Sequence, residues 1–421
     1  MTAHTYRWRF IFALLLGAFM LAPICVTQAQ SLNDGWKALD DEYRGRSKLI
    51  NALLGGKTAT DPGDKKHVEA LDLAAKYDTY RVYLDHLEVP DPKQTNRPSI
   101  DRVFKDFERN VSGLERTKET TKAAAEIYRD KVRLHALEVI QFDKAATVHK
   151  IHNARILAEI ARLGQPQLAE TLVTVLKDDK QNDGVRYYAL RGLRNLLALS
   201  QPMQSLLNKD QEAKTAEALL DFLEHKQGPP KGAAPEEIDG FCVLRREVIR
   251  ALALMHTPAV SDKVRPALTL ARFAGGDGGI QPPPRIDERM EAAVGLARMQ
   301  SAENKEYQAD YAAWQIGHCL GAFAQKANEE KEGDRTRPWK IDAYRLSEAL
   351  DALKEINGKN TYVVSVVNRG KRLLGEVMKG SQANTNDVTW FLTPQSDPPS
   401  KELFKGAADT VVKPAEEPAE K

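Results

Sequence analysis

The chain has 421 residues, of which 42% are hydrophobic, 29% charged and only 7% aromatic. This length suffices for two or three ordinary domains or one extended repeat array, and the composition suits helices that bury one face and hydrate the other. Without its first 29 residues, which hold two arginines and no acid, the chain has 61 − 2 = 59 basic against 59 acidic residues. That balance excludes the broad positive field typical of nucleic-acid-binding proteins.

The N-terminus has the pattern of a secretory signal peptide. Arg7 and Arg9 precede an apolar run over residues 10–22, which is shorter than the ~20 residues needed to span a bilayer. Thr27 and Ala29 fit the small-x-small cleavage rule, which predicts cleavage after Ala29. We therefore expect a secreted or periplasmic protein with no stable membrane span after cleavage; the alternative is that the segment is retained as an anchor.

Residues 30–147 differ in sequence pattern from the remainder of the chain. Helical patterns over 65–87 and 100–114 alternate with turn-rich stretches at 55–64 and 89–99. We expect an irregular helical region that caps the N-terminal end of a repeat array.

An internal repeat is the main feature of residues 148–380. The segment 183–200 has one apolar helical stripe, in which a small residue precedes Leu193 and another apolar residue follows three positions later. The same pattern surrounds Leu252, Leu296 and Leu353, and a weaker match surrounds Ile160. A small residue at this position predicts the close approach of two packed helices.

Two insertions explain the uneven spacing of the repeats. The segments 226–240 and 326–340 are rich in Pro, Gly and charged residues, and each is predicted to be a loop. Valine-rich residues 361–378 could be a strand, but their length and apolar spacing favour a helix. Residues 381–421 are predicted to be an extended segment, apolar enough around 388–395 to dock on the last helix, followed by a disordered tail.

The segment Asp183–Leu193, "DGVRYYALRGL", resembles the bacterial, PBS-lyase-like type of HEAT repeat, whose first helix opens D-x-V-R and continues to A-L. The resemblance extends with many departures over residues 151–378. It implies an all-α α-solenoid, in which antiparallel helix pairs stack into a curved binding surface.

No residue pattern indicates catalysis, a metal site or a cofactor. His149 and His152 share a helix face but have no third ligand at a telling spacing, so we expect two surface residues. His318 and Cys319 are adjacent and point apart on a helix. Gly275–Arg285 is glycine-rich but lacks the Lys and Ser/Thr of a phosphate loop.

The two cysteines that lie beyond the signal segment, Cys242 and Cys319, are interpreted as buried small residues; pairing between them stays open.

Partner binding is the leading functional hypothesis, with a protein or peptide as the partner. The candidate contacts are Arg335, Arg337 and Trp339 in the second insertion and a basic ridge of Arg186, Arg191 and Arg194. For the ridge, the alternative is a solvated face paired with acids on neighbouring helices; for Trp339, it is burial at the start of the next helix. Two other functions stay open: an enzyme or small-ligand-binding protein with its site in the N-terminal region, and a structural component of a cell-envelope assembly.

Overall fold

The structure is a computed structural model that describes residues 36–82, 99–116, 118–200, 204–224, 228–229, 232–330, 338–393 and 398–406. The predicted signal segment and the C-terminal tail lie outside these ranges. Among the described residues every regular element is helical, and the one β-type contact is an isolated bridge between Tyr307 and Phe404. The predicted all-α class is therefore confirmed. None of the described helices combines the length and hydropathy needed to cross a membrane.

The chain divides into two compact units, one up to Leu163 and one from Gly164. The sequence placed the start of the repeat array earlier, at residue 148. The helix that begins there packs against α6 of the first unit, so the unit boundary follows this helix rather than preceding it.

Unit 1 is organised around a long central helix, α6, which contacts α3, α4, α5 and α7. Its elements are α3 (Trp36–Leu54), α4 (Lys65–Arg81), α5 (Ile100–Arg116), α6 (Lys118–Gln141), α7 (Thr147–Ile160) and the short 3-10 helix η2 (Ala161–Leu163). The core of the unit includes Leu71, Phe104, Phe107, Tyr128 and Ile140, all fully buried.

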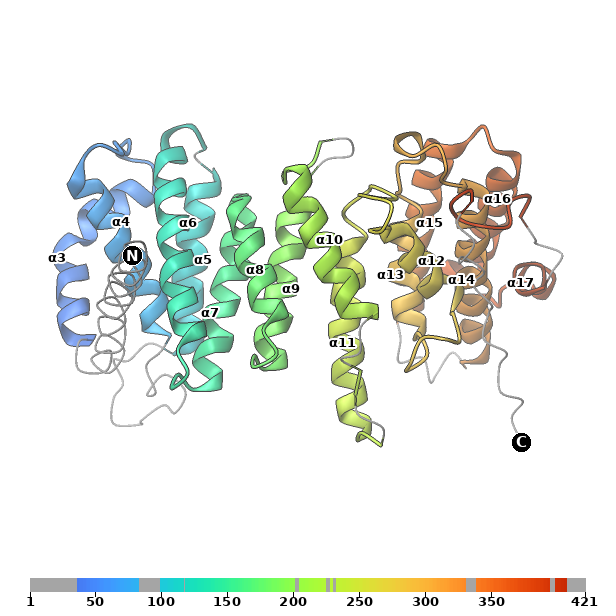
Figure 1. The fold of residues 1–421 in the computed structure, drawn as a ribbon, viewed down its shortest axis with the longest axis horizontal. Coiled ribbons are helices and arrows are strands. Elements are labelled where there is room, and N and C mark those ends of the chain that lie inside the picture. Colours follow the sequence, from blue (N-terminus) through green and yellow to red (C-terminus); the bar gives the residue numbers. More distant parts are fainter. Residues whose placement is uncertain are drawn as a thin grey trace, which may run out of the picture. The chain divides into compact units, whose positions relative to one another are not determined.

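Unit 2 consists of two layers of helices (Figure 1). The first layer contains α8 (Gln167–Lys177), α10 (Lys209–Glu224), α12 (Pro266–Gly275), α14 (Ala309–Glu329) and α16 (Thr361–Lys379). The second layer contains α9 (Asp183–Leu197), α11 (Pro235–Leu252), α13 (Ile286–Leu296) and α15 (Trp339–Asn357). Each helix contacts its neighbours within the layer and, except between α9 and α10, packs on its chain neighbours in the other layer. This is the predicted solenoid of stacked antiparallel helix pairs.

Local signals in the sequence set the helix ends. The Asn182 side chain caps α9 by accepting a hydrogen bond from the Gly184 amide at 2.8 Å. Helix α12 begins at Pro266, where a missing amide hydrogen costs nothing, and ends before Gly276, whose φ of 75° favours glycine. The valine-rich segment is helical, as predicted, and forms α16 behind the Asn360 cap.

The recurring small residue marks a close helix contact, as the sequence predicted. A Cβ atom on Gly295 of α13 would lie 2.7 Å from the Cα atom of Ala253 at the end of α11. The apolar residues that follow the small position are buried in every copy: Leu193, Leu252, Leu296 and Leu353, together with Ile160 of the weaker match. At Gly295 this close contact lies between neighbouring helices of the second layer, and the buried apolar residues mark the inner face of each helix.

The C-terminal region is more ordered than an extended segment. Helix α17 (Thr385–Leu392) follows a cap by Asn384 and packs mainly on α14, less on the last layer helix α16. Its Phe391 side chain is buried against Gly317 of α14, where the absent side chain leaves room. Residues 398–406 then pair with the segment just before α14, where Tyr307 and Phe404 form the isolated bridge, and Phe404 is buried.

Candidate functional site: a charged ladder on the second layer

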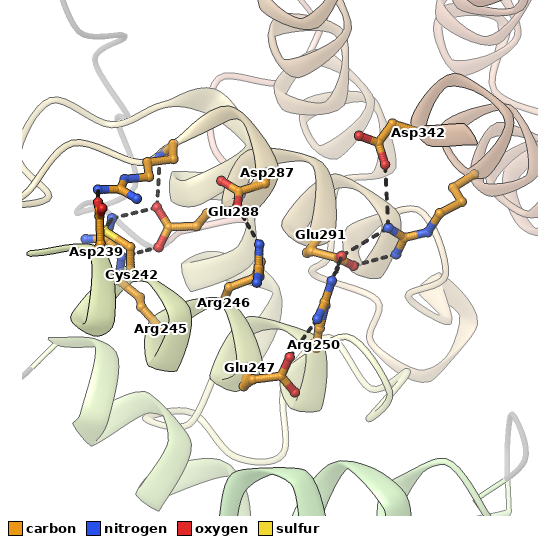
Figure 2. Close-up of polar contacts among 12 residues, drawn as sticks. Asp239, Cys242, Arg245, Arg246, Glu247, Arg250, Asp287, Glu288, Glu291 and Asp342 are labelled. Atoms are coloured by element: carbon orange, nitrogen blue, oxygen red, sulfur yellow. Dashed lines mark hydrogen bonds and ion pairs between the residues drawn. The ribbon is translucent and has the colours of Figure 1, made fainter. Parts of the chain in front are cut away.

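Five charged side chains from four consecutive second-layer helices form a continuous row, here called the charged ladder. Arg194 of α9 donates to Glu247 of α11 at 2.7 Å, and Arg250 of α11 donates to the other oxygen of Glu247 at 2.6 Å. Arg250 also donates to Glu291 of α13 at 2.7 Å through Nη2. Arg345 of α15 binds Glu291 with two bonds of 2.7 and 3.1 Å. Figure 2 shows the part of the ladder around Glu247, Arg250 and Glu291.

The repeat itself explains why these residues meet. Arg194 directly follows the buried Leu193, so it lies at the edge of the buried stripe of α9. Glu247 and Arg250 lie three positions apart on α11 and therefore share one face of that helix. Because the second-layer helices are stacked side by side, a charge on this face reaches across to the next helix.

The acids of the ladder lie below the arginines. The side chains of Glu247 and Glu291 are 3% and 7% exposed, whereas those of Arg194, Arg250 and Arg345 are 28%, 29% and 41% exposed. Asp342, which lies 4.0 Å from Arg345 in the same helix, is also nearly buried. The solvent-exposed groups of the ladder are therefore the guanidinium groups, while the carboxylates that neutralise them are buried.

Ionisation within the ladder follows from this arrangement. Burial alone would raise the pKa of Glu291, but hydrogen bonds from Arg345 and Arg250 outweigh it and hold that pKa below its ordinary value. Burial would lower the pKa of Arg250, yet its bonds to Glu291 and Glu247 raise it. Glu291 and Arg250 are thus both charged at neutral pH.

Two further ion pairs join α11 to α13 beside the ladder (Figure 2). Arg245 binds Glu288 with two bonds of 2.5 and 2.7 Å, and both side chains are fully buried. Arg246 donates to Asp287 at 2.6 Å and is partly exposed. The first pair belongs to the core and the second to the same surface as the ladder.

The predicted basic ridge is divided by the structure. Arg186 is buried and donates to the Asp178 carbonyl oxygen at 3.1 Å and to Asp179 at 3.4 Å, which corrects its predicted place on a binding surface. The Arg191 guanidinium lies 5.7 Å from the ring centre of Tyr188 on its own helix. Only Arg194 enters the ladder. The alternative expectation, that these arginines pair with acids on neighbouring helices, describes Arg194.

The insertion between α14 and α15 gives a mixed outcome. Arg335 and Arg337 lie outside the described residues. Trp339 is buried at the first turn of α15, where its Nε1 donates to Glu330 at 2.7 Å and its ring packs edge-on against Phe323. The structure therefore corrects its proposed role as an exposed anchor and places it where the alternative expected it.

Other polar candidates are part of the packing. His149 is buried rather than on the surface, because it lies on the inner face of α7. Burial and the nearby Arg289 lower the pKa of His318 to about 4. Cys242 and Cys319 are both buried, as favoured, and they do not pair in a disulfide. The described residues contain no cluster of three or more His, Cys, Asp or Glu side chains suited to a metal ion.

The glycine-rich segment before α13 is a turn, as predicted. Asp277 in this turn accepts hydrogen bonds from Arg272 at 2.7 Å and from the Gly279 amide at 2.9 Å. Its carboxylate is therefore occupied by the turn itself.

Asp78 of unit 1 is a buried carboxyl group whose pKa is shifted strongly from its ordinary value. Burial raises the pKa of Asp78 to about 6, although hydrogen bonds from Tyr128 at 2.5 Å and Asn110 at 3.2 Å oppose the shift. The side chain is 3% exposed. A catalytic acid must reach its substrate, so this group is better explained by packing between α4, α5 and α6.

Unit 2 also contains a cavity of about 830 Å³ between the loops that follow α9 and α11. Its lining is mixed, with Lys209 and Asn208 on one side and Leu254 and Met255 on the other. His256, also in the lining, has a φ of 58°, which is uncommon for a residue other than glycine. The volume is in the range of small-ligand sites.

Comparisons with protein-family models, curated proteins and solved structures found no match for this chain. The ladder and the cavity are therefore judged by their own geometry.

Proposed function

We propose that this chain is a non-catalytic scaffold that binds a protein or peptide across the second layer of unit 2. The observation that carries the proposal is the charged ladder, because it presents three arginines, from α9, α11 and α15, along a row that crosses four second-layer helices. Arginine dominates the energetics of many protein interfaces. The buried glutamates fix the orientation of each guanidinium group before a partner arrives, which lowers the entropic cost of binding.

The proposal includes an extracytoplasmic location and a relationship to HEAT repeats. The location is supported by Arg7, Arg9 and the apolar run after them. The relationship is supported by the segment Asp183–Leu193 and by the two-layer stacking of unit 2. Repeat arrays of this type offer long surfaces built from successive helices, which suits partner binding.

Site-specific photo-crosslinking in the native host tests the binding surface. A photoreactive amino acid at Tyr187 of α9 or Glu348 of α15 lies on the second layer, and one at Glu217 of α10 lies on the first layer as a matched exposed control. We expect one discrete protein adduct from the two second-layer positions and none from position 217. Adducts from position 217 alone would contradict the proposed surface.

The cavity favours a second candidate function, the binding of a small ligand. Native mass spectrometry of protein purified from its host would show a bound mass in this case. The substitution Ala259→Trp should fill the cavity from its lining and remove that mass. A mass retained by the variant would place the ligand elsewhere.

A further inference from the structure

The ladder arginines retain hydrogen-bonding capacity toward solvent. A guanidinium group has five N–H donors. Arg345 uses two of them on Glu291, and Arg194 uses one on Glu247, counting partners among the described residues. The remaining donors belong to side chains that are 28% and 41% exposed. The ladder can therefore accept further carboxylates without giving up its internal bonds.

Apolar side chains flank this row on the same surface. Val243 lies one turn before Glu247 on α11, and Ile341 lies one turn before Arg345 on α15. Both are exposed, as is Tyr344, three positions beyond Ile341. Large apolar side chains exposed beside a row of arginines are typical of an interface.

The spacing of the ladder indicates the form of the ligand. Arg250 and Arg345 donate to the same oxygen of Glu291 at 2.7 and 3.1 Å, and Arg194 and Arg250 donate to the two oxygens of Glu247 at 2.7 and 2.6 Å. Neighbouring guanidinium groups therefore lie closer together than the axes of packed helices, which are about 8–10 Å apart. An extended chain advances about 3.3 Å per residue and points every second side chain to the same face, so a peptide along the ladder would meet a new arginine about every second residue.

We propose that the second layer of unit 2 binds an extended acidic peptide whose carboxylates recur about every second residue, with apolar side chains flanking them. This inference rests on the proposed function and names the chemistry of its partner. The planar guanidinium fork matches a carboxylate with two hydrogen bonds. Exposed Val243, Ile341 and Tyr344 supply contacts for the flanking apolar residues.

A peptide fits this surface better than a nucleic acid does. The whole chain carries a formal charge of only +2, and each ladder arginine already has a covered acidic neighbour. Binding to a phosphate backbone depends on releasing many counterions from a strongly charged polymer, which requires a broad excess of positive charge. A surface with a few guanidinium groups and apolar neighbours therefore suits a peptide with a few carboxylates better than it suits a phosphate backbone.

Fluorescence polarisation with synthetic peptides and the full chain tests this inference. The probe is a labelled peptide, Leu-Glu-Ser-Glu-Ser-Glu-Leu, and the matched peptides carry Gln or Lys in place of Glu. A further peptide has the same composition with its glutamates placed together. We expect the probe with alternating glutamates to bind at least ~10-fold more tightly than the Gln peptide, and binding to weaken as salt rises. The clustered peptide should bind several-fold more weakly than the probe.

Variants of the protein locate the binding on the second layer. Arg345→Gln removes the most exposed ladder arginine while Arg250 still pairs with Glu291, and we expect ~3–10-fold weaker probe binding. Ile341→Ser should weaken binding of the Leu-containing probe. Lys214→Gln on α10 of the first layer removes an exposed positive charge elsewhere in the unit and should leave affinity unchanged. Thermal unfolding of each variant confirms that the fold is retained.

Several results would overturn the inference. They are equal affinity for the Glu and Gln peptides, tighter binding of the Lys peptide, tighter binding of a single-stranded oligonucleotide, or equal loss in the Arg345 and Lys214 variants. A second-layer crosslink to a protein, combined with no affinity for the acidic probe, would reject the acidic partner and leave the proposed function standing. Failure of both experiments would reject both.

Discussion

Arg245 and Glu288 form an ion pair with no exposed surface, and the carbonyl oxygen of Pro282 accepts a further bond from Arg245 at 2.8 Å. Removing one partner would leave the other charge buried without compensation. We therefore expect Arg245→Met to lower the free energy of unfolding by about 3–5 kcal/mol, measured by chemical denaturation. The double variant with Glu288→Leu should be less destabilised than Arg245→Met alone. A double variant that is worse would show that the pair itself, not the orphaned charge, holds α11 to α13.

Asp78 should make unit 1 less stable as pH rises. Its pKa is about 6 in the folded chain against 3.8 for the free side chain, so the folded state binds more protons between these values. Stability contributed by this group is therefore full below pH 3.8 and lost as pH rises toward 6, by roughly 2–3 kcal/mol.

The substitution Asp78→Asn tests this dependence. We expect the variant to unfold at a higher temperature than the wild type at pH 7.5 and to match it near pH 3.5. Asp41→Asn, at an exposed position of α3, removes a charge without burial and should not change the profile. An unchanged slope between pH 4 and 6 in the Asp78 variant would assign the titration to another group.

At the scale of single residues, the sequence predicts which side chains are buried better than it predicts which side chains contact one another. Leu193 and its counterparts were identified from periodicity because one face of each helix must be apolar. The fate of the arginines depends on which helices become neighbours. Arg186 and Arg194 lie on the same helix eight positions apart, yet one is buried near Asp178 and the other joins Glu247. Nothing in their local sequence separates them, because the deciding contacts are more than a turn away.

At the scale of elements, glycine has opposite effects in two helices. Gly295 of α13 lies against the backbone of Ala253 and has no room for a side chain. Gly375 lies within α16 and an added Cβ would meet nothing within 4 Å. We expect Gly295→Ala to destabilise the chain by about 1–3 kcal/mol through overpacking. Gly375→Ala should stabilise it by about 0.5–1 kcal/mol because alanine favours the helix. Thermal unfolding of the pair measures both, and equal effects would mean that the close approach at Gly295 relaxes freely.

The segment between α14 and α15 should tolerate replacement if its ends are preserved. Asn328 exchanges two hydrogen bonds with the backbone of Ala383, and Glu330 accepts one from Trp339, so a replacement must begin after Glu330. We expect a Gly/Ser segment at 331–337 to shift the melting temperature by only a few degrees. Trp339→Ala should cost about 3–5 kcal/mol because it empties a buried site. A sharp loss of stability from the replacement would show that the segment itself is structural.

A role of Arg335 and Arg337 in partner binding stays a prediction, which the same replacement tests by its effect on crosslinking.

The helices of the repeat were predictable from the sequence because caps, prolines and apolar periodicity act locally. Helix α17 was not, since an eight-residue segment has weak helical preference of its own. It is stabilised by the contact of Phe391 with Gly317, which lies 74 positions earlier in the chain. Likewise the first predicted insertion, 226–240, includes the start of α11 at Pro235. Loop-like composition there reflects the proline that begins the helix.

At the scale of the whole molecule, the stability of a solenoid is approximately a sum over neighbouring repeats. The charged ladder adds a second connection, because Glu291 of α13 receives hydrogen bonds from α11 and α15 at once. Loss of this carboxylate should therefore loosen three second-layer helices together rather than one. The ladder could not have been deduced from the sequence, since it requires the order in which four helices stack.

We expect Glu291→Gln to lower the free energy of unfolding by about 3 kcal/mol. The neutral amide is a weaker hydrogen-bond acceptor for the guanidinium groups of Arg250 and Arg345 than the carboxylate is. Hydrogen exchange followed by mass spectrometry should show reduced protection in α11, α13 and α15, with α8 and the whole of unit 1 unchanged.

The pH dependence of the stability contributed by Glu291 has the opposite sign to that of Asp78. The pKa of Glu291 is held below its ordinary 4.5, so its stabilisation is present above that pH and lost as pH falls through the lowered folded value. The wild type should therefore approach the variant in acid, and the difference between them should be largest at neutral pH. A loss of protection confined to α13, or a difference that persists unchanged at low pH, would show that Glu291 acts within its own helix and that the ladder does not couple its neighbours.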